Sequence, residues 1–289
     1  MLLLLAAAVT IPLGLDLYMP VPEDNPLAPG KITLGRELFF NKRLSRDGSV
    51  ACASCHDPER AFSDGRAVAI GVFGRRGRRN APALINRGYG RLFFWDGRVA
   101  TLEEQVLKPI QDPNEMDMTL PEAAARVGLA VDEISHALAS FVRSILSGDS
   151  AYDRFISGDR AALTTQQQEG LQIFREKGNC TACHVGPNFS DEKLHNTGVA
   201  WRDGKLADAG AGKGNFKTPT LREVARTAPY MHDGSLATLE DVVEFYSQGG
   251  RPNPDLDPEI RPRNFKPEEK RALVAFLKCL SGKIQERLR

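Results

Sequence analysis

Cys52-Ala53-Ser54-Cys55-His56 and Cys180-Thr181-Ala182-Cys183-His184 are two copies of the pattern Cys-x-x-Cys-His. Two thiols at this spacing can form thioethers to the two vinyl groups of one porphyrin, and the histidine that follows can then ligate the iron from below the ring. The pattern is the attachment signature of c-type haem. The sequence therefore predicts two covalent haems, held by Cys52, Cys55, Cys180 and Cys183, with His56 and His184 as iron ligands.

A repeat surrounds the two motifs and bears on the main alternative, zinc. A structural zinc ion takes about four cysteine and histidine ligands, so the motifs could share one ion. Flanking segments that match each other favour a separate haem in each half of the chain. The matched segments are 35–39 with 170–174 before the motifs, and 80–84 with 217–221 and 96–106 with 233–243 after them, the last two pairs both offset by 137 residues.

The repeat predicts a mainly α fold of two cytochrome c-like haem domains. We expect a signal-like or anchor segment at 1–20, an N-terminal haem domain at 21–160 and a C-terminal haem domain at 161–289. The apolar start is shorter than a membrane span of about 20 residues and is typical of a secretory signal. It therefore predicts a periplasmic location, with no membrane span beyond a possible N-terminal anchor.

Charge excludes one class of partner. The 38 lysines and arginines nearly balance the 37 aspartates and glutamates, which gives a formal net charge of +1. A nucleic-acid-binding domain usually carries a basic stripe or patch, so no nucleic-acid partner is expected.

The repeat also bears on the sixth iron ligand. Thr238 is followed by acidic residues, a pattern that favours a helix start, and Tyr246 lies eight residues later, about two helical turns on. Tyr246 could therefore ligate the second iron, although a buried core tyrosine is the alternative. The matching residue in the first half is Pro109, which cannot ligate iron, so the first haem is expected to have an open distal face.

Three methionines compete with Tyr246 as soft iron ligands. They are Met116, Met118 and Met231. Methionine more often fills a hydrophobic core, so Tyr246 is preferred to all three.

Polar residues gather in the first half where the second half lacks them. Gln105 matches Val242 and Glu115 matches Pro252 in the repeat. Beside an open iron, a carboxylate can move a proton between the two oxygens of peroxide so that water leaves, and an amide can orient the oxidant. Glu115 is therefore a candidate acid–base group, with a surface acid as the alternative.

Taken together, these segments resemble the bacterial di-haem cytochrome c peroxidase family. The resemblance is nearest to its MauG-like branch, which oxidises tryptophan and has members associated with the methanobactin system. It covers about residues 30–280. The motifs that carry it are CASCH, FSDG, RNAPALIN, FFWDGR, TLEEQ, DPNEM, CTACH, TPTLREVARTAPYMHDG and TLEDVVEFY.

The resemblance implies roles for particular residues. His56 and His184 are similar to the proximal haem ligands, Trp95 to an electron relay between the haems, and Gln105 and Glu115 to the pair that handles peroxide at the N-terminal haem.

The resemblance further implies a calcium ion between the domains. Asn80 and the backbone carbonyls of Thr227 and Pro229 match its contacts, and oxygen ligands suit calcium. His232 matches a family histidine near the second haem.

Three departures from the family patterns bear on the branch. Conventional peroxidases carry a histidine in the loop after FSDG, where residues 69–74 have none, and a methionine where this chain has Tyr246. Both features favour the MauG-like branch. MauG itself has a tryptophan just before its second haem motif, but residues 176–179 contain none, and Trp201 is the only tryptophan of the second half. Any exit route for oxidising equivalents must therefore differ.

The expected activity follows from the resemblance. We expect a di-haem enzyme that uses hydrogen peroxide and oxidises a partner protein through a high-valent di-haem state. One alternative is a conventional cytochrome c peroxidase, which detoxifies hydrogen peroxide with electrons from a small cytochrome or copper protein. Another is a non-enzymatic di-haem electron carrier, which would leave Gln105 and Glu115 unexplained. The expected partners are hydrogen peroxide and a redox protein that acts as donor or substrate.

Overall fold

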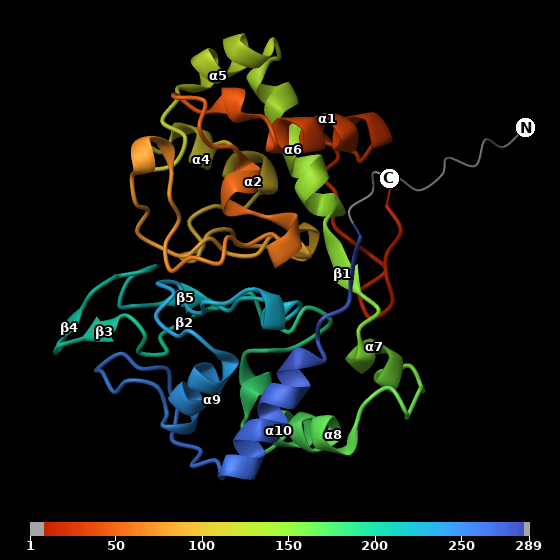
Figure 1. The fold of residues 1–289 in the computed structure, drawn as a ribbon, viewed down its shortest axis with the longest axis vertical. Coiled ribbons are helices and arrows are strands. Elements are labelled where there is room, and N and C mark those ends of the chain that lie inside the picture. The colour runs from red at the N-terminus through yellow and green to blue at the C-terminus, as the bar shows by residue number, and fades with distance from the viewer. Residues whose placement is uncertain (1–8, 286–289) are drawn as a thin grey trace, which may run out of the picture.

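Two pairs of packed helices organise the computed structural model, which describes residues 9–285 (Figure 1). In the upper part of the molecule α1 (Pro29–Phe39) packs against α6 (Val131–Ser144). In the lower part α8 (Thr165–Arg175) packs against α10 (Pro267–Lys278). The two pairs come from the two halves of the repeat.

A glycine lets each helix pair approach closely. A Cβ atom on Gly35 would lie 1.9 Å from the carbonyl oxygen of Ala137, and one on Gly170 would lie 2.0 Å from that of Ala272. A real Cβ cannot approach a backbone oxygen so closely, because the two atoms would overlap sterically. The glycine in each copy of the repeated motif therefore fixes how near its helix can come to its partner.

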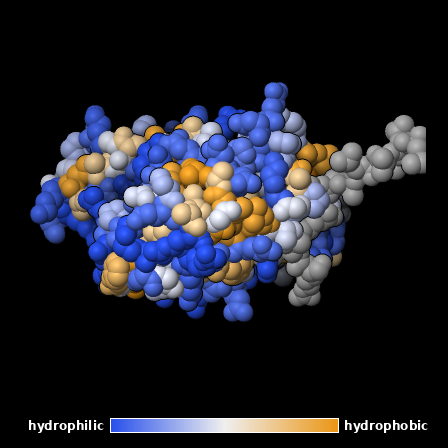
Figure 2. All heavy atoms as spheres, turned by 90° about the horizontal axis from the view of Figure 1, so that it is seen from above, coloured by the Kyte–Doolittle hydropathy of each residue, from blue (hydrophilic) through white to orange (hydrophobic). Residues whose placement is uncertain are grey.

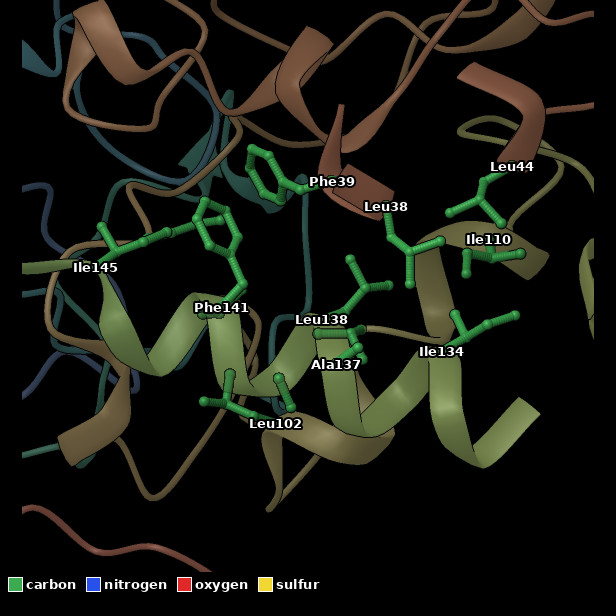
Figure 3. Close-up of a cluster of buried hydrophobic side chains, with 14 of the residues drawn as sticks. Leu38, Phe39, Leu44, Leu102, Ile110, Ile134, Ala137, Leu138, Phe141 and Ile145 are labelled. Atoms are coloured by element: carbon green, nitrogen blue, oxygen red, sulfur yellow. The ribbon is translucent and has the colours of Figure 1, made fainter. Parts of the chain in front are cut away.

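Each helix pair carries its own hydrophobic core. The aromatic residue that ends the motif packs across the pair, with ring centroids 5.0 Å apart for Phe39 and Phe141 and 5.1 Å apart for Phe174 and Phe276. Figure 3 shows the first core, in which side chains of α1 and α6 point toward one another. The second core is a separate cluster around α8 and α10. Two cores are the packing expected when one repeat unit folds twice.

The remaining helices are short. Thr101 and Thr238 cap two of them, accepting hydrogen bonds from the backbone N–H of Glu104 at 3.2 Å and of Asp241 at 3.0 Å, so the predicted start at Thr238 is confirmed. These helices are α2 (Cys52–Cys55), α3 (Leu102–Gln105), α4 (Lys108–Gln111), α5 (Leu120–Val127), α7 (Ala151–Ile156) and α9 (Leu239–Ser247).

Sheet structure is sparse, so the prediction of a mainly α fold is confirmed for residues 9–285. Three antiparallel pairs are present, and in one of them Ser147 lies opposite Ile284, which returns the C-terminal strand to the first half. The pairs are β1 (Leu146–Gly148) with β6 (Lys283–Gln285), β2 (Leu194–His195) with β5 (Phe216–Lys217), and β3 (Trp201–Arg202) with β4 (Lys205–Leu206).

The predicted N-terminal segment falls partly on residues 1–8, which lie outside the described residues. The part that follows is attached to the body: the carbonyl of Leu13 accepts from the N–H of Asp149 at 2.8 Å, and that of Gly14 accepts from Arg222 at 2.9 Å. Within residues 9–285 no helix is both long and apolar enough to cross a membrane. Seen from above, the surface is largely hydrophilic, with hydrophobic side chains gathered near its centre (Figure 2).

Candidate functional site

A cavity of about 790 Å³ lies where the two halves meet, and both haem motifs line it. The first motif contributes Cys55 and His56, and the second contributes Cys180, Cys183 and His184. Ligand pockets in proteins span about 300–1,000 Å³, so the space is of the size that cofactors occupy. The tertiary fold thus brings together two motifs that lie far apart in the sequence.

The two motif histidines are oriented in the same way. In each ring Nδ1 is paired with a backbone carbonyl, that of Phe62 at 3.0 Å for His56 and that of Phe189 at 2.8 Å for His184. A carbonyl can only accept, so Nδ1 carries the proton and Nε2 keeps its lone pair for a metal. Burial lowers the pKa of His56 to about 4 and also lowers that of His184, which keeps both imidazoles neutral, as iron ligation requires.

The four motif cysteines are free thiols and form no disulfide. Burial raises the pKa of Cys52 and of Cys180 to about 12, so these thiols are protonated at neutral pH. Two free thiols and a neutral imidazole are the donor set that c-type haem uses. Both motifs supply that set, with at least one thiol and the imidazole of each on the cavity wall, and therefore fit the cofactor.

A zinc ion shared by the two motifs is not supported. Among residues 9–285, one group of possible metal ligands comes within 4.8 Å of one another, and it consists of Cys183, Asp191 and His195. This group draws on the second motif alone, whereas a shared tetrahedral site needs ligands from both.

Tyr246 lies on α9 and lines the cavity with His184. Burial raises the pKa of the Tyr246 phenol above its ordinary value, and the nearby thiols of Cys183 and Cys180 add to the effect. A buried phenol of this kind gives up its proton readily only beside a cation. Its position and chemistry suit an iron ligand.

The competing methionines lie in two different places. Met116 and Met118 are 3% and 2% exposed within the first hydrophobic core, which is the ordinary place for methionine. Met231 lines the cavity together with Tyr246. The core packing leaves Met231 as the methionine that could reach the second haem.

On the N-terminal side the cavity wall contains Gln105, Pro109 and Glu115. Burial, and then the carboxylate of Asp112, raise the pKa of Glu115 to about 7. A carboxyl group with a pKa near neutrality can both accept and donate a proton at physiological pH. The wall thus combines an amide, a proline that cannot ligate iron, and a carboxyl group able to transfer protons.

The loop at 69–74 packs directly on Glu115. The N–H of Val72 donates to the carbonyl of Glu115 at 2.8 Å, and a Cβ atom on Gly71 would lie 2.1 Å from the carbonyl oxygen of Asn114. Glycine at this position therefore permits a close backbone approach that a side chain would prevent. The loop, which has no histidine, is held against the segment that carries Glu115.

Trp95 connects the two halves. Its indole N–H donates to the carbonyl of Asn80 at 2.9 Å, and its own carbonyl accepts from the N–H of Lys217 at 2.7 Å. Trp95 also lines the shared cavity. Trp201 lies on β3 and is not among the residues that line this cavity.

The residues matched to calcium contacts lie on the same cavity. Asn80, Thr227 and Pro229 all line it. Asn80 is 7% exposed, and its Nδ2 donates to the carbonyl of Arg66 at 2.6 Å, which leaves Oδ1 as the amide atom able to bind a cation. His232 is 4% exposed and stacks on Phe216 with ring centroids 3.7 Å apart.

Two charged clusters at the junction were not expected from the sequence. Arg79 forms a forked pair with Asp208 at 2.8 and 2.9 Å and also contacts Asp96 at 2.7 Å. Arg87 binds Glu192 at 2.9 Å. The partners are separated by up to 129 residues in the chain. A local sequence pattern cannot predict pairs between residues so far apart.

Comparison with known proteins identifies the family. Residues 29–129 match the family described as di-haem cytochrome c peroxidase. The methylamine utilization protein MauG of Methylorubrum extorquens is 38% identical to this chain, over 91% of the chain and 82% of that protein. The chain belongs to the di-haem cytochrome c peroxidase family. It is therefore a peroxidase-like oxidoreductase, and the two haems predicted from the motifs are those of its family.

The chain is also similar to a cytochrome c peroxidase and to a solved MauG-like structure. The cytochrome c551 peroxidase of Nitrosomonas europaea is 33% identical, over 91% of this chain and 83% of that protein. Among solved structures, a MauG-like protein associated with microbial copper homeostasis has a TM-score of 0.83 and 36% identity, covering 93% of this chain and 94% of the other. The relatives thus include MauG-like proteins as well as cytochrome c peroxidases.

Proposed function

We propose that this enzyme is MauG-like: it reacts with hydrogen peroxide at the N-terminal haem and oxidises an external redox protein through the C-terminal haem. The observation that carries the proposal is the cavity wall around Glu115, where Pro109 stands in place of an iron ligand and the loop at 69–74 offers no histidine. Residues 21–160 would form the peroxidatic domain and residues 161–289 the electron-transfer domain. When bound, the haems supply the redox chemistry.

The chain's own residues would prepare the peroxide reaction. His56, with Nδ1 held by the carbonyl of Phe62 at 3.0 Å, would hold the iron through Nε2. Glu115 would take the proton from the inner peroxide oxygen and return it to the outer one, so that water leaves. Gln105 would orient peroxide by hydrogen bonding.

Trp95 and Tyr246 would serve the second haem. Trp95 is hydrogen-bonded to Asn80 in one half and to Lys217 in the other, which supports a role as the electron relay across the junction. Tyr246 would ligate the second haem iron together with His184, and as an anionic oxygen donor it would favour the oxidised state more than a neutral methionine does. His232 would flank this haem.

Calcium is proposed at the junction, bound by the side chain of Asn80 and the carbonyls of Thr227 and Pro229. Their shared cavity and the free Oδ1 of Asn80 support this assignment. Asn80→Ala should weaken calcium binding by at least about tenfold, the lower end of what losing a supporting group at a metal site costs. Isothermal titration calorimetry of chelator-treated protein would measure the change, and an unchanged affinity would place the ion elsewhere.

Location and partner follow from the chemistry. Covalent haem attachment and the signal-like start favour the periplasm, and the substrate would be a redox protein that docks outside the cavity. The relative in Methylorubrum is named for methylamine utilization, but residues 176–179 contain no tryptophan, so a different exit route and a different protein substrate are proposed.

The second candidate function is a conventional peroxidase fed by a small cytochrome or copper protein, which the similarity to a cytochrome c551 peroxidase supports. Stopped-flow absorbance of the fully ferric, haem-loaded protein with stoichiometric peroxide separates the two. A fast reaction without prior reduction, followed by a long-lived change in the haem spectrum, is expected for the MauG-like enzyme. No reaction until one haem has been reduced would assign the chain to the conventional class.

A further inference from the structure

Lys217 is a buried cation that the proposed mechanism does not use. Its side chain is 9% exposed and lines the cavity between the halves. Its ammonium group donates to the carbonyl of Thr218 at 3.1 Å, and the nearest carboxylate oxygen, on Glu192, is 3.5 Å away. An ammonium group has three donors, and these two contacts use at most two of them in a side chain that lines a cavity of the size that holds a cofactor.

The neighbouring charges leave this cation undercompensated. Glu192 is already engaged by Arg87 at 2.9 Å, so two cations share one carboxylate. The carboxylate of the preceding residue, Asp191, is hydrogen-bonded to His195 at 2.9 Å. Burial, followed by the guanidinium of Arg87, lowers the pKa of Lys217 to about 7. Buried charges are ordinarily paired. We therefore expect an anion in the cavity that pairs with the Lys217 ammonium group.

Two backbone hydrogen bonds hold the chain at Lys217. Its N–H donates to the carbonyl of Trp95 at 2.7 Å, and the N–H of the next residue, Thr218, donates to that of Lys193 at 2.9 Å. The backbone of Lys217 is therefore fixed between the proposed relay and the segment that follows the second haem motif. The repeat places Asn80 at the matching position of the first half, so only the second half has a cation here.

Lys217 and the second haem motif line the same cavity, with Cys180, Cys183 and His184 on its wall. A c-type haem carries two propionate carboxylates, which are its anionic groups. We propose that Lys217 binds a propionate of the haem attached at Cys180 and Cys183, and that its charge raises the reduction potential of that haem. This inference rests on the proposed second haem site.

Removal of the charge should act on one haem. Without Lys217 the extra positive charge of the ferric state is better tolerated, so the ferric form of the second haem is favoured. Lys217→Met should lower one of the two midpoint potentials by the equivalent of at least a tenfold change in equilibrium constant, about 59 mV for a one-electron couple. Lys217→Arg, which keeps the charge, should restore most of the shift.

Spectroelectrochemical titration of the two-haem protein measures both potentials, and the resonance Raman band of the propionate bend reports the contact itself. Lys213→Met is the matched control, because Lys213 is 73% exposed and pairs with Asp255 at the surface. If the methionine variant does not accumulate, Lys217→Gln removes the charge while keeping a donor.

Two results would overturn the assignment: both potentials unchanged in a Lys217→Met protein that retains two haems, or an equal shift in the Lys213→Met control. The peroxide reaction of the wild-type protein is a separate readout. Loss of that reaction would refute the proposed function while leaving a shifted potential intact, so the two failures are distinguishable.

Discussion

Glu115→Gln should make the protein more stable at high pH and slower with peroxide. Burial and the Asp112 carboxylate raise the pKa of Glu115 from its ordinary 4.5 to about 7. One pKa unit corresponds to about 1.4 kcal/mol, so ionised Glu115 costs the fold about 3 kcal/mol above pH 7. The folded state holds this proton more tightly than the unfolded chain does. Its stabilising contribution is therefore complete below pH 4.5 and is lost as the pH rises to about 7.

Denaturant unfolding on both sides of this window would measure the first effect. Relative to wild type, the glutamine variant should gain up to about 3 kcal/mol of unfolding free energy above pH 7 and almost nothing below pH 4.5. Stopped-flow mixing with peroxide would measure the second. The second-order rate constant should fall by roughly 100- to 10,000-fold, the usual contribution of a positioned acid–base group, and its dependence on a pKa near 7 should disappear.

A surface acid from the same region provides the control. Glu104 is 52% exposed and pairs with Lys108 one helical turn away, and such pairs contribute little, so Glu104→Gln should change neither quantity. A Glu115→Gln enzyme with the wild-type rate, or one that keeps the pH dependence, would refute the acid–base role. A rate loss with no gain in stability at high pH would mean that Glu115 ionises normally in the fold.

Three further predictions test other parts of the molecule. Gly170→Ala should destabilise the protein by about 1–3 kcal/mol through overpacking, because the new Cβ would meet the carbonyl of Ala272 at 2.0 Å. Thermal unfolding should show the loss as a lower melting temperature. The control is Gly30→Ala, whose new Cβ would meet nothing within 4 Å, and it should leave the melting temperature unchanged or higher. Tyr246→Phe should alter the absorption and electron paramagnetic resonance signals of one haem, and unchanged signals would exclude tyrosine ligation. Trp95→Phe should slow the transfer of oxidising equivalents between the haems without slowing the first reaction with peroxide; equal rates of transfer would remove Trp95 from the route.

Much of the fold could be predicted because its determinants repeat. The glycine and the aromatic residue before each haem motif are the residues that meet the partner helix, as Gly35 and Phe39 of α1 do when they contact α6. The helix cap predicted at Thr238 is also present. It could be predicted because a helix start depends on neighbouring residues within one turn. The division near residue 160 stays a prediction, and α7, which ends before it, packs on the second core through Ala151, Tyr152 and Phe155.

The methionines show where sequence patterns stop being informative. Met116, Met118 and Met231 have the same side chain, yet two lie in the first core and one lines the cavity. The sequence could rank them as ligands only by their residue type. Burial within a particular core depends on how distant helices pack, which no spacing along the chain records.

By itself the sequence determined the chemistry at the motifs, because two thiols and a histidine within five consecutive residues fix their own spacing. It also determined the repeat, and Pro109, at the position that matches Tyr246, led us to expect an open distal face on the first haem. Only the tertiary structure decided that both motifs share one cavity and that Lys217 faces it beside an already paired Glu192. Glu192 and the Arg87 that pairs with it are 105 residues apart in the chain, and they meet because the loops of two separate cores pack against each other.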